Sequence, residues 1–124
     1  MNEQLSNIIQ ENYQRIAPEI ILKHSDIGRI EKIGRYWDNK NEIDNIGLNY
    51  NTGEIFFIES KWSNKLIGVN ILDELIAKAK TIDWNRDNHK KKYVLLSKSG
   101  FTQEIIKASK KDKNIILIQG NKII

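Results

Sequence analysis

The first twenty residues carry apolar side chains at the three-to-four spacing of an amphipathic helix. Pro18 is expected to break or kink this helix, with a short continuation over residues 20–22. A strand with imperfect alternation is expected over residues 30–36. The apolar stripe of the helix consists of Leu5, Ile8, Ile9, Tyr13 and Ile16.

Two strand-like runs, over residues 43–50 and 54–62, flank the tripeptide Asn51-Thr52-Gly53. Asparagine and glycine adopt the backbone conformations that tight turns require. The pattern therefore predicts an antiparallel hairpin, which is the clearest local structure in the chain.

The rest of the chain alternates between helical and extended patterns. A helical face runs over residues 69–79, a short apolar strand over 93–96, a helix over 101–110 capped by Thr102, and a strand over 115–118. The predicted order is helix-strand-strand-strand-helix-strand-helix-strand. It indicates an α/β three-layer sandwich whose central mixed sheet joins an antiparallel hairpin to parallel crossover strands.

The composition supports one soluble domain over residues 1–124. The chain has 124 residues, one proline and 40% apolar residues, so it can build one core and offers no obvious linker. It has no long apolar run, which argues against a membrane span. Its N-terminus lacks the basic start and apolar block of a secretion signal, so a cytoplasmic location is expected.

The absence of cysteine excludes disulfides and thiolate-bound metals, so a bound metal would take oxygen ligands, as Mg²⁺ does. The net charge of +4 favours a polyanionic partner without proving one. Basic residues cluster over 86–92 and 107–113, where solubility explains them as well as phosphate binding does. The candidate nucleic-acid contacts are Lys65, Arg86, Lys90, Lys91 and Lys92.

Two carboxylates and a lysine are expected to converge on the hairpin. Alternation places Asp44 on the more apolar face of its strand, and it places Glu59 and Lys61 together at the end of the next strand. Chains rarely bury such groups without a partner. The apolar companions on these faces are Ile46, Leu48 and Tyr50 in the first strand, and Ile55 and Phe57 in the second.

The register of the hairpin decides whether the two acids meet. If Tyr50 pairs with Gly53, Asp44 lies opposite Glu59 on one face, whereas a shift by one residue sets Asp44 opposite Ser60. We predict the first register, or a bulge that restores it.

Two neighbouring carboxylates repel each other unless a cation lies between them, and Mg²⁺ or Mn²⁺ suits such an oxygen-lined site. A bound ion activates water and polarises a phosphate, while Lys61 beside it offsets negative charge. The alternative is structural: Glu59 and Lys61 form an edge pair, and Asp44 caps the backbone or bridges to Arg35. Spacing alone does not separate these alternatives.

The segments Glu42-Ile43-Asp44 and Ile55-Phe-Phe-Ile-Glu59-Ser60-Lys61 resemble the motif of the PD-(D/E)XK nuclease superfamily, which has the restriction-endonuclease-like fold. More narrowly, three segments resemble the nuclease-like domain found C-terminal to archaeal-type P-loop ATPases. No proline precedes Asp44, and the chain lacks a P-loop motif, so it is not the ATPase part. The three segments are IGRYWDNKNEIDNIGLN, IFFIESKWSNK and YVLLSKSGFTQE.

The resemblance implies that Asp44, Glu59 and the Ser60 backbone carbonyl bind the metal and that Lys61 is the catalytic lysine. Many relatives carry another acid on the first helix. Glu11 is the nearest candidate for this ligand, although Gln10 competes for the same alignment.

We therefore expect a metal-dependent hydrolase of DNA of the endonuclease type, with an RNA-directed enzyme as a weaker alternative. The rival is a catalytically inactive nucleic-acid-binding or assembly module that serves a P-loop ATPase. Cutting both strands usually needs two sites, so a homodimer is compatible with the first reading.

Of the tryptophans, Trp37 and Trp62 lie near the expected site, where packing in the core or at an interface explains them better than stacking on an unpaired base.

Overall fold

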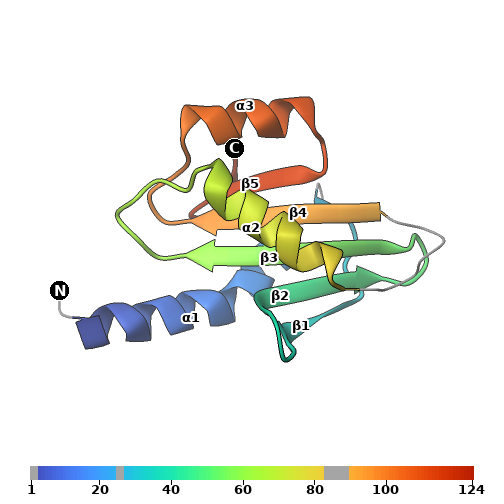
Figure 1. Cartoon of the computed structure of the whole chain (residues 1–124), viewed down its shortest axis with the longest axis horizontal. Helices are drawn as coiled ribbons and strands as arrows, with labels where there is room; N and C mark the ends of the chain where they lie inside the picture. The colour runs from blue at the N-terminus through green and yellow to red at the C-terminus, as the bar shows by residue number, and fades with distance from the viewer. Residues whose placement is uncertain (1–2, 25–26, 83–89) are drawn as a thin grey trace.

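The computed structural model describes residues 3–24, 27–82 and 90–124. In this part of the chain one mixed sheet has the strand order β1-β2-β3-β4-β5-β6, with helices on both faces (Figure 1). The predicted α/β class and element order are confirmed, and the short β6 is an addition at the C-terminal end. The elements are α1 (Glu3–Leu22), β1 (Lys32–Trp37), β2 (Glu42–Asn49), β3 (Glu54–Lys61), α2 (Val69–Lys80), β4 (Lys90–Ser97), α3 (Gln103–Lys111), β5 (Ile115–Gln119) and β6 (Lys122–Ile123).

The central strand β3 separates two apolar cores, because its alternating side chains are buried on both faces. Ile55 and Phe57 pack with α2 and α3, whereas Phe56 and Ile58 pack with α1. In Figure 1, α2 crosses in front of β3 and β4. The chain is thus a three-layer structure with β3 between the two cores. Glu59 to Lys61 are the last residues of this central strand.

Pro18 does not break α1, contrary to the expectation from its residue type. A proline at position 18 cannot donate a hydrogen bond to the carbonyl of Gln14, four residues earlier. That carbonyl instead accepts from Asn45 Nδ2 of β2, at 3.4 Å. The side chain of a neighbouring strand therefore satisfies the group that the proline leaves open, and the helix continues to Leu22.

The β2–β3 hairpin has the predicted turn and the predicted register. Asn49 O accepts from Gly53 N at 2.9 Å, and Gly53 has a φ of 76°, which glycine adopts at little cost. Asn49 lies opposite Glu54 and Asn45 opposite Ile58. The pairing ends at Asn45 and Ile58, so Asp44 and Glu59 are the next residue on each strand.

The β1–β2 pairing is irregular beside the site, because its register shifts between Gly34 and Tyr36. A bulge of this kind sets two residues of one strand against one of the other and resets the alternation of side chains. Ile43 accordingly packs in the same core as Ile46, on the α2 and α3 side. The prediction that Asp44 shares the face of Ile46 was therefore wrong, since the Asp44 carboxylate turns toward α1.

Candidate functional site

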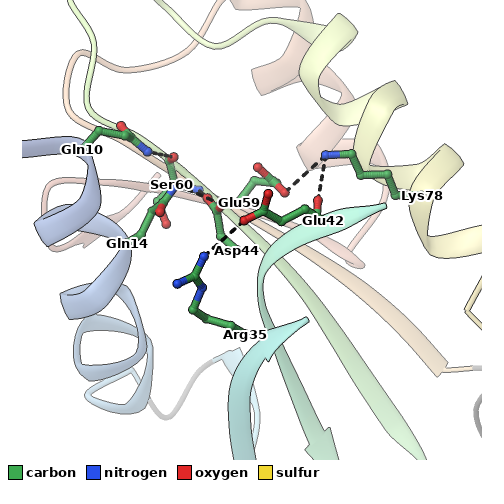
Figure 2. Close-up of polar contacts among 8 residues, drawn as sticks. All are labelled: Gln10, Gln14, Arg35, Glu42, Asp44, Glu59, Ser60 and Lys78. Carbon is green, nitrogen blue, oxygen red and sulfur yellow. Dashed lines mark hydrogen bonds and ion pairs between the residues drawn. The ribbon is translucent and has the colours of Figure 1, made fainter. Parts of the chain in front are cut away.

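Asp44 lies near the start of β2, with its carboxylate between α1 and the end of β3 (Figure 2). Its Oδ2 accepts from the backbone N–H of Ser60 at 2.9 Å, and its Oδ1 accepts from Gln14 Nε2 at 3.1 Å. Burial raises the pKa of Asp44 above its ordinary value, although the Ser60 amide and the charges of Lys61 and Lys78 oppose the rise. Asp44 is thus held firmly but remains costly to ionise.

Glu59 is buried, with 7% of its surface exposed, at the end of β3. Within the described part of the chain its Oε1 has no hydrogen-bond partner, and the nearest cation, Lys78 Nζ, lies 3.9 Å away. Burial and then the negative charge of Asp44 raise the pKa of Glu59 to about 7, against the opposing charges of Lys78 and Lys61. The two acids therefore repel each other within one small region.

Two lysines on different elements face this pair. Lys61 ends β3, is half-buried and lowers the pKa of both carboxyls through its charge. Lys78 comes from α2, and its Nζ donates to the backbone carbonyl of Glu42 at 2.9 Å (Figure 2). The helical pattern predicted α2, but nothing in that pattern pointed Lys78 toward the acids.

Two glutamines of α1 complete the site: Gln10, which competed with Glu11 for the alignment, and Gln14, which was not predicted. Gln10 Nε2 donates to Ser60 O at 2.8 Å, and its Oε1 accepts from Trp62 N at 2.6 Å. One amide side chain therefore binds the backbone on both sides of Lys61, as a neighbouring strand would. The signal available in the sequence was the spacing of Gln10 and Gln14, which lie four residues apart and therefore on one helix face.

The donor atoms fit Mg²⁺ or Mn²⁺. Two carboxylates and the Ser60 carbonyl offer oxygen ligands, which these ions prefer, and ions of this kind keep several waters as well. Glu59 Oε1 is buried beside a second carboxylate and has no hydrogen bond from the described parts of the chain, which is the feature that a cation would satisfy. Among the described residues no third acid or histidine joins the pair.

Glu11 is the predicted ligand that the structure places elsewhere. It is exposed and lines a cavity of about 540 Å³ between α1 and the β1–β2 hairpin, because it lies off the helix face that carries Gln10 and Gln14. The cavity adjoins the site through Gln14 and Asn45, and its charged residues are of both signs. Its lining consists of Glu11, Gln14, Arg15, Pro18, Gly34, Arg35, Glu42 and Asn45.

A family model described as archaeal and bacterial proteins of unknown function, DUF234, matches residues 1–82. The chain belongs to the DUF234 family. This match covers about two thirds of the chain and includes Asp44, Glu59 and Lys61.

The uncharacterized protein MJECL04 of Methanocaldococcus jannaschii is 30% identical over 92 residues, which are 69% of this chain and 20% of the relative. The DUF234 chain thus spans about one fifth of the length of this curated relative.

Two solved structures resemble this DUF234 chain. A repair endonuclease from Pyrococcus abyssi has a TM-score of 0.51 at 15% identity, covering 96% of this chain and 47% of that one. The protein of unknown function AF1548 has a TM-score of 0.52 at 18% identity, covering 84% of this chain and 54% of that one. At these identities the likeness shows the fold alone, and that fold is one that an endonuclease uses.

The basic residues predicted to contact nucleic acid lie in different places. Lys90, Lys91 and Lys92 begin β4, and β4 runs parallel to β3, so they lie beside Glu54 and not beside Glu59. Their partners on β3 precede Glu59 by three to five residues, roughly 10–17 Å along the strand. Lys92 Nζ also forms an ion pair with Glu54 at 2.8 Å. Their predicted role as contacts to nucleic acid stays a prediction, and it would act at the end of β3 away from Glu59.

Of the remaining candidates, Lys65 is exposed in the loop after β3, at the site end of the sheet. Arg86 lies outside the described residues. Trp37, at the end of β1, is 71% exposed, so it does not pack in the core, and its packing at an interface stays a prediction. None of the described helices is long and apolar enough to cross a membrane.

We expect Gln10→Ala to lower the free energy of unfolding by about 1–3 kcal/mol, because two backbone groups beside Lys61 lose a partner. The variant should also lose cleavage activity, since the Lys61 backbone is no longer held. Urea unfolding and plasmid nicking measure the two effects. Glu11→Gln is the matched control on the same helix, and we expect it to leave both unchanged. Loss of activity in Glu11→Gln, with Gln10→Ala unaffected, would restore Glu11 as the ligand.

Proposed function

We propose that this chain is a metal-dependent nuclease domain that hydrolyses phosphodiester bonds in DNA. The observation that carries the proposal is the Asp44–Glu59 pair beside Lys61, in which Glu59 is buried and its Oε1 finds no hydrogen-bond partner among the described residues. A chain gains no stability from burying two like charges together, so such a pair points to a function. An endonuclease-type fold around the pair supports the same reading.

Asp44, Glu59 and the Ser60 carbonyl would hold Mg²⁺ or Mn²⁺. When bound, such an ion polarises the phosphate and lowers the pKa of a water molecule. Gln14 and the Ser60 amide orient Asp44, which keeps the two carboxylates close together. Asp44 and Glu59 must both lose their protons to bind an ion, so binding releases protons at neutral pH.

Lys61 supplies the positive charge at the reacting phosphate. Hydrolysis joins a water oxygen to phosphorus and breaks the bond to one ester oxygen, which takes up a proton as it leaves. Negative charge grows on the phosphate oxygens during this exchange, and an ammonium group held nearby stabilises it. Lys61 also orients the attacking water, because an ammonium group has three donors.

Nicking of supercoiled plasmid tests the proposal directly. We expect the wild type to cut with Mg²⁺ or Mn²⁺ and to stop when a chelator is added. Asp44→Asn should lower the rate at least about 100-fold, because one ligand and one negative charge are lost. Asp73→Asn, which changes an exposed acid of α2, serves as the control and should cut normally.

The second candidate is a catalytically inactive module that binds nucleic acid or assembles with a P-loop ATPase. It is favoured by the hydrogen bond from Gln10 to Ser60 O, which engages a carbonyl that the nuclease would use as a ligand. The span of one fifth of a longer relative also agrees with a module inside a larger protein. Folded wild type that cuts neither plasmid nor single strands with any divalent ion would favour this candidate.

A further inference from the structure

The loops after β3 and β4 are joined by hydrogen bonds beside Lys61. The two strands are parallel neighbours, so both of these loops leave the same edge of the sheet. Ile67 N donates to Gly100 O and Thr102 N donates to Ile67 O, each at 3.0 Å. Lys98 N donates to Lys61 O at 3.2 Å, which ties the second loop to the end of β3 itself. Ligands of open α/β sheets commonly bind at this carboxyl edge.

Trp62 lies at this edge of the sheet, immediately after Lys61. Trp62 is 36% exposed, and its ring packs against that of Tyr13 in a T-shaped contact, with ring centroids 5.5 Å apart. Its backbone N–H is held by Gln10. A large aromatic ring is thus kept in one place while part of its surface remains open to solvent.

Lys98 places a cation over the same ring, with Nζ 4.9 Å from the ring centroid. Lys98 is exposed, and its Nζ also donates to Asn64 Oδ1 at 3.1 Å. A lysine on a flexible stem can move to a phosphate and leave the ring face to another flat group. Trp62 and Lys98 together therefore match the two parts of a nucleotide, because the ring can stack on a flat base and the ammonium group can pair with a negative phosphate.

We propose that Trp62 and Lys98 form a platform for one unpaired nucleotide next to the scissile phosphate. This inference rests on the proposed nuclease function and narrows its substrate to single-stranded or frayed DNA. A base inside a duplex has both faces covered by its neighbours, so it can stack on Trp62 only after it leaves the helix. Trp62 is already held by Tyr13 and Gln10, which lowers the entropic cost of binding.

Fluorescence anisotropy of a labelled twelve-nucleotide thymidine strand tests the platform, with a chelator present so that nothing is cut. We expect Trp62→Leu to weaken binding of the single strand about 5- to 150-fold, the range for loss of one base stack. Binding of a blunt hairpin duplex should stay within twofold. Lys98→Gln, an exposed substitution, should lower the slope of log affinity against log salt by about 0.7.

Tyr50→Leu is the matched control, since it removes another exposed aromatic ring at the opposite end of the hairpin. It should leave binding of the single strand unchanged. Equal losses on single strand and duplex in Trp62→Leu, or full affinity in both Trp62→Leu and Lys98→Gln with normal melting curves, would overturn the platform. Because binding is measured without cleavage, a wild type that binds single strands but never cuts DNA would refute the nuclease and not the platform.

Discussion

Lys61→Ala is expected to lower the rate of plasmid nicking by about 10²–10³-fold, the usual cost of removing one group that stabilises transition-state charge. Lys61 is half-buried at the end of β3, where its charge acts on both Asp44 and Glu59. Single-turnover nicking with saturating Mn²⁺ measures the effect on chemistry, because neither product release nor weak ion binding then limits the rate.

Two further substitutions test whether the loss of nicking rate is specific to the ammonium group of Lys61. Lys65→Ala removes an exposed lysine four residues later, and it should change the rate by less than about threefold. Lys61→Arg keeps the charge but not the compact ammonium group, and it should recover only a small part of the rate. Nicking by Lys61→Ala at the wild-type rate would show that the lysine serves the fold and not the reaction.

The hairpin and the central strand could be predicted from sequence because local chemistry decides them. The turn at Asn51 to Gly53 requires residues that accept special backbone conformations, and it sets the register that brings Asp44 to Glu59. The apolar run of β3 likewise indicates a strand covered on both faces. Asp44, Glu59 and Lys61 therefore lie close together as expected, although their roles stay predictions.

The rest of the site depends on packing between distant parts of the chain. Gln10 and Gln14 reach the site because α1 lies against β2 and β3, which no local pattern specifies. Lys78 arrives on α2 for the same reason. Charge clustering in sequence likewise does not specify which end of a parallel strand faces the site, and the basic start of β4 lies at the end away from Glu59.

Pro18 shows how such long-range contacts tie the fold to the site. It leaves the Gln14 carbonyl open, and Asn45 of β2 fills that gap. The side chain of the same Gln14 binds Asp44, the neighbour of Asn45 in the irregular part of β2. Gln14 thus connects Pro18 in α1 with the irregular part of β2 and with the Asp44 carboxylate.

Glu59→Gln is expected to abolish metal-dependent cleavage and yet to stabilise the metal-free protein. The pKa of Glu59 is about 7 in the folded protein and 4.5 ordinarily, because the group is buried beside Asp44. Ionising it therefore costs the folded state on the order of 3 kcal/mol at pH 8. Glutamine has nearly the same shape and carries no charge, so the variant avoids this cost.

The difference in stability between Glu59→Gln and the wild type is expected to depend on pH. Below about pH 4.5 the carboxyl is protonated in both folded and unfolded chains, so it carries no penalty. As the pH rises from 4.5 to 7 the unfolded chain loses the proton while the folded chain keeps it, so the free energy of unfolding falls and stays lower above pH 7. Urea unfolding with a chelator should therefore show wild type and Glu59→Gln similar at pH 5 and the variant more stable at pH 8.

A matched substitution and added metal separate this effect from a general gain in stability. Glu74→Gln, at an exposed position on α2, should unfold like the wild type at both pH values. Mn²⁺ should stabilise the wild type at pH 8 and leave Glu59→Gln nearly unchanged, because binding to the folded state alone raises stability. A variant no more stable than the wild type at pH 8 would mean that Lys78 and Lys61 already neutralise Glu59, and that the pair needs no ion.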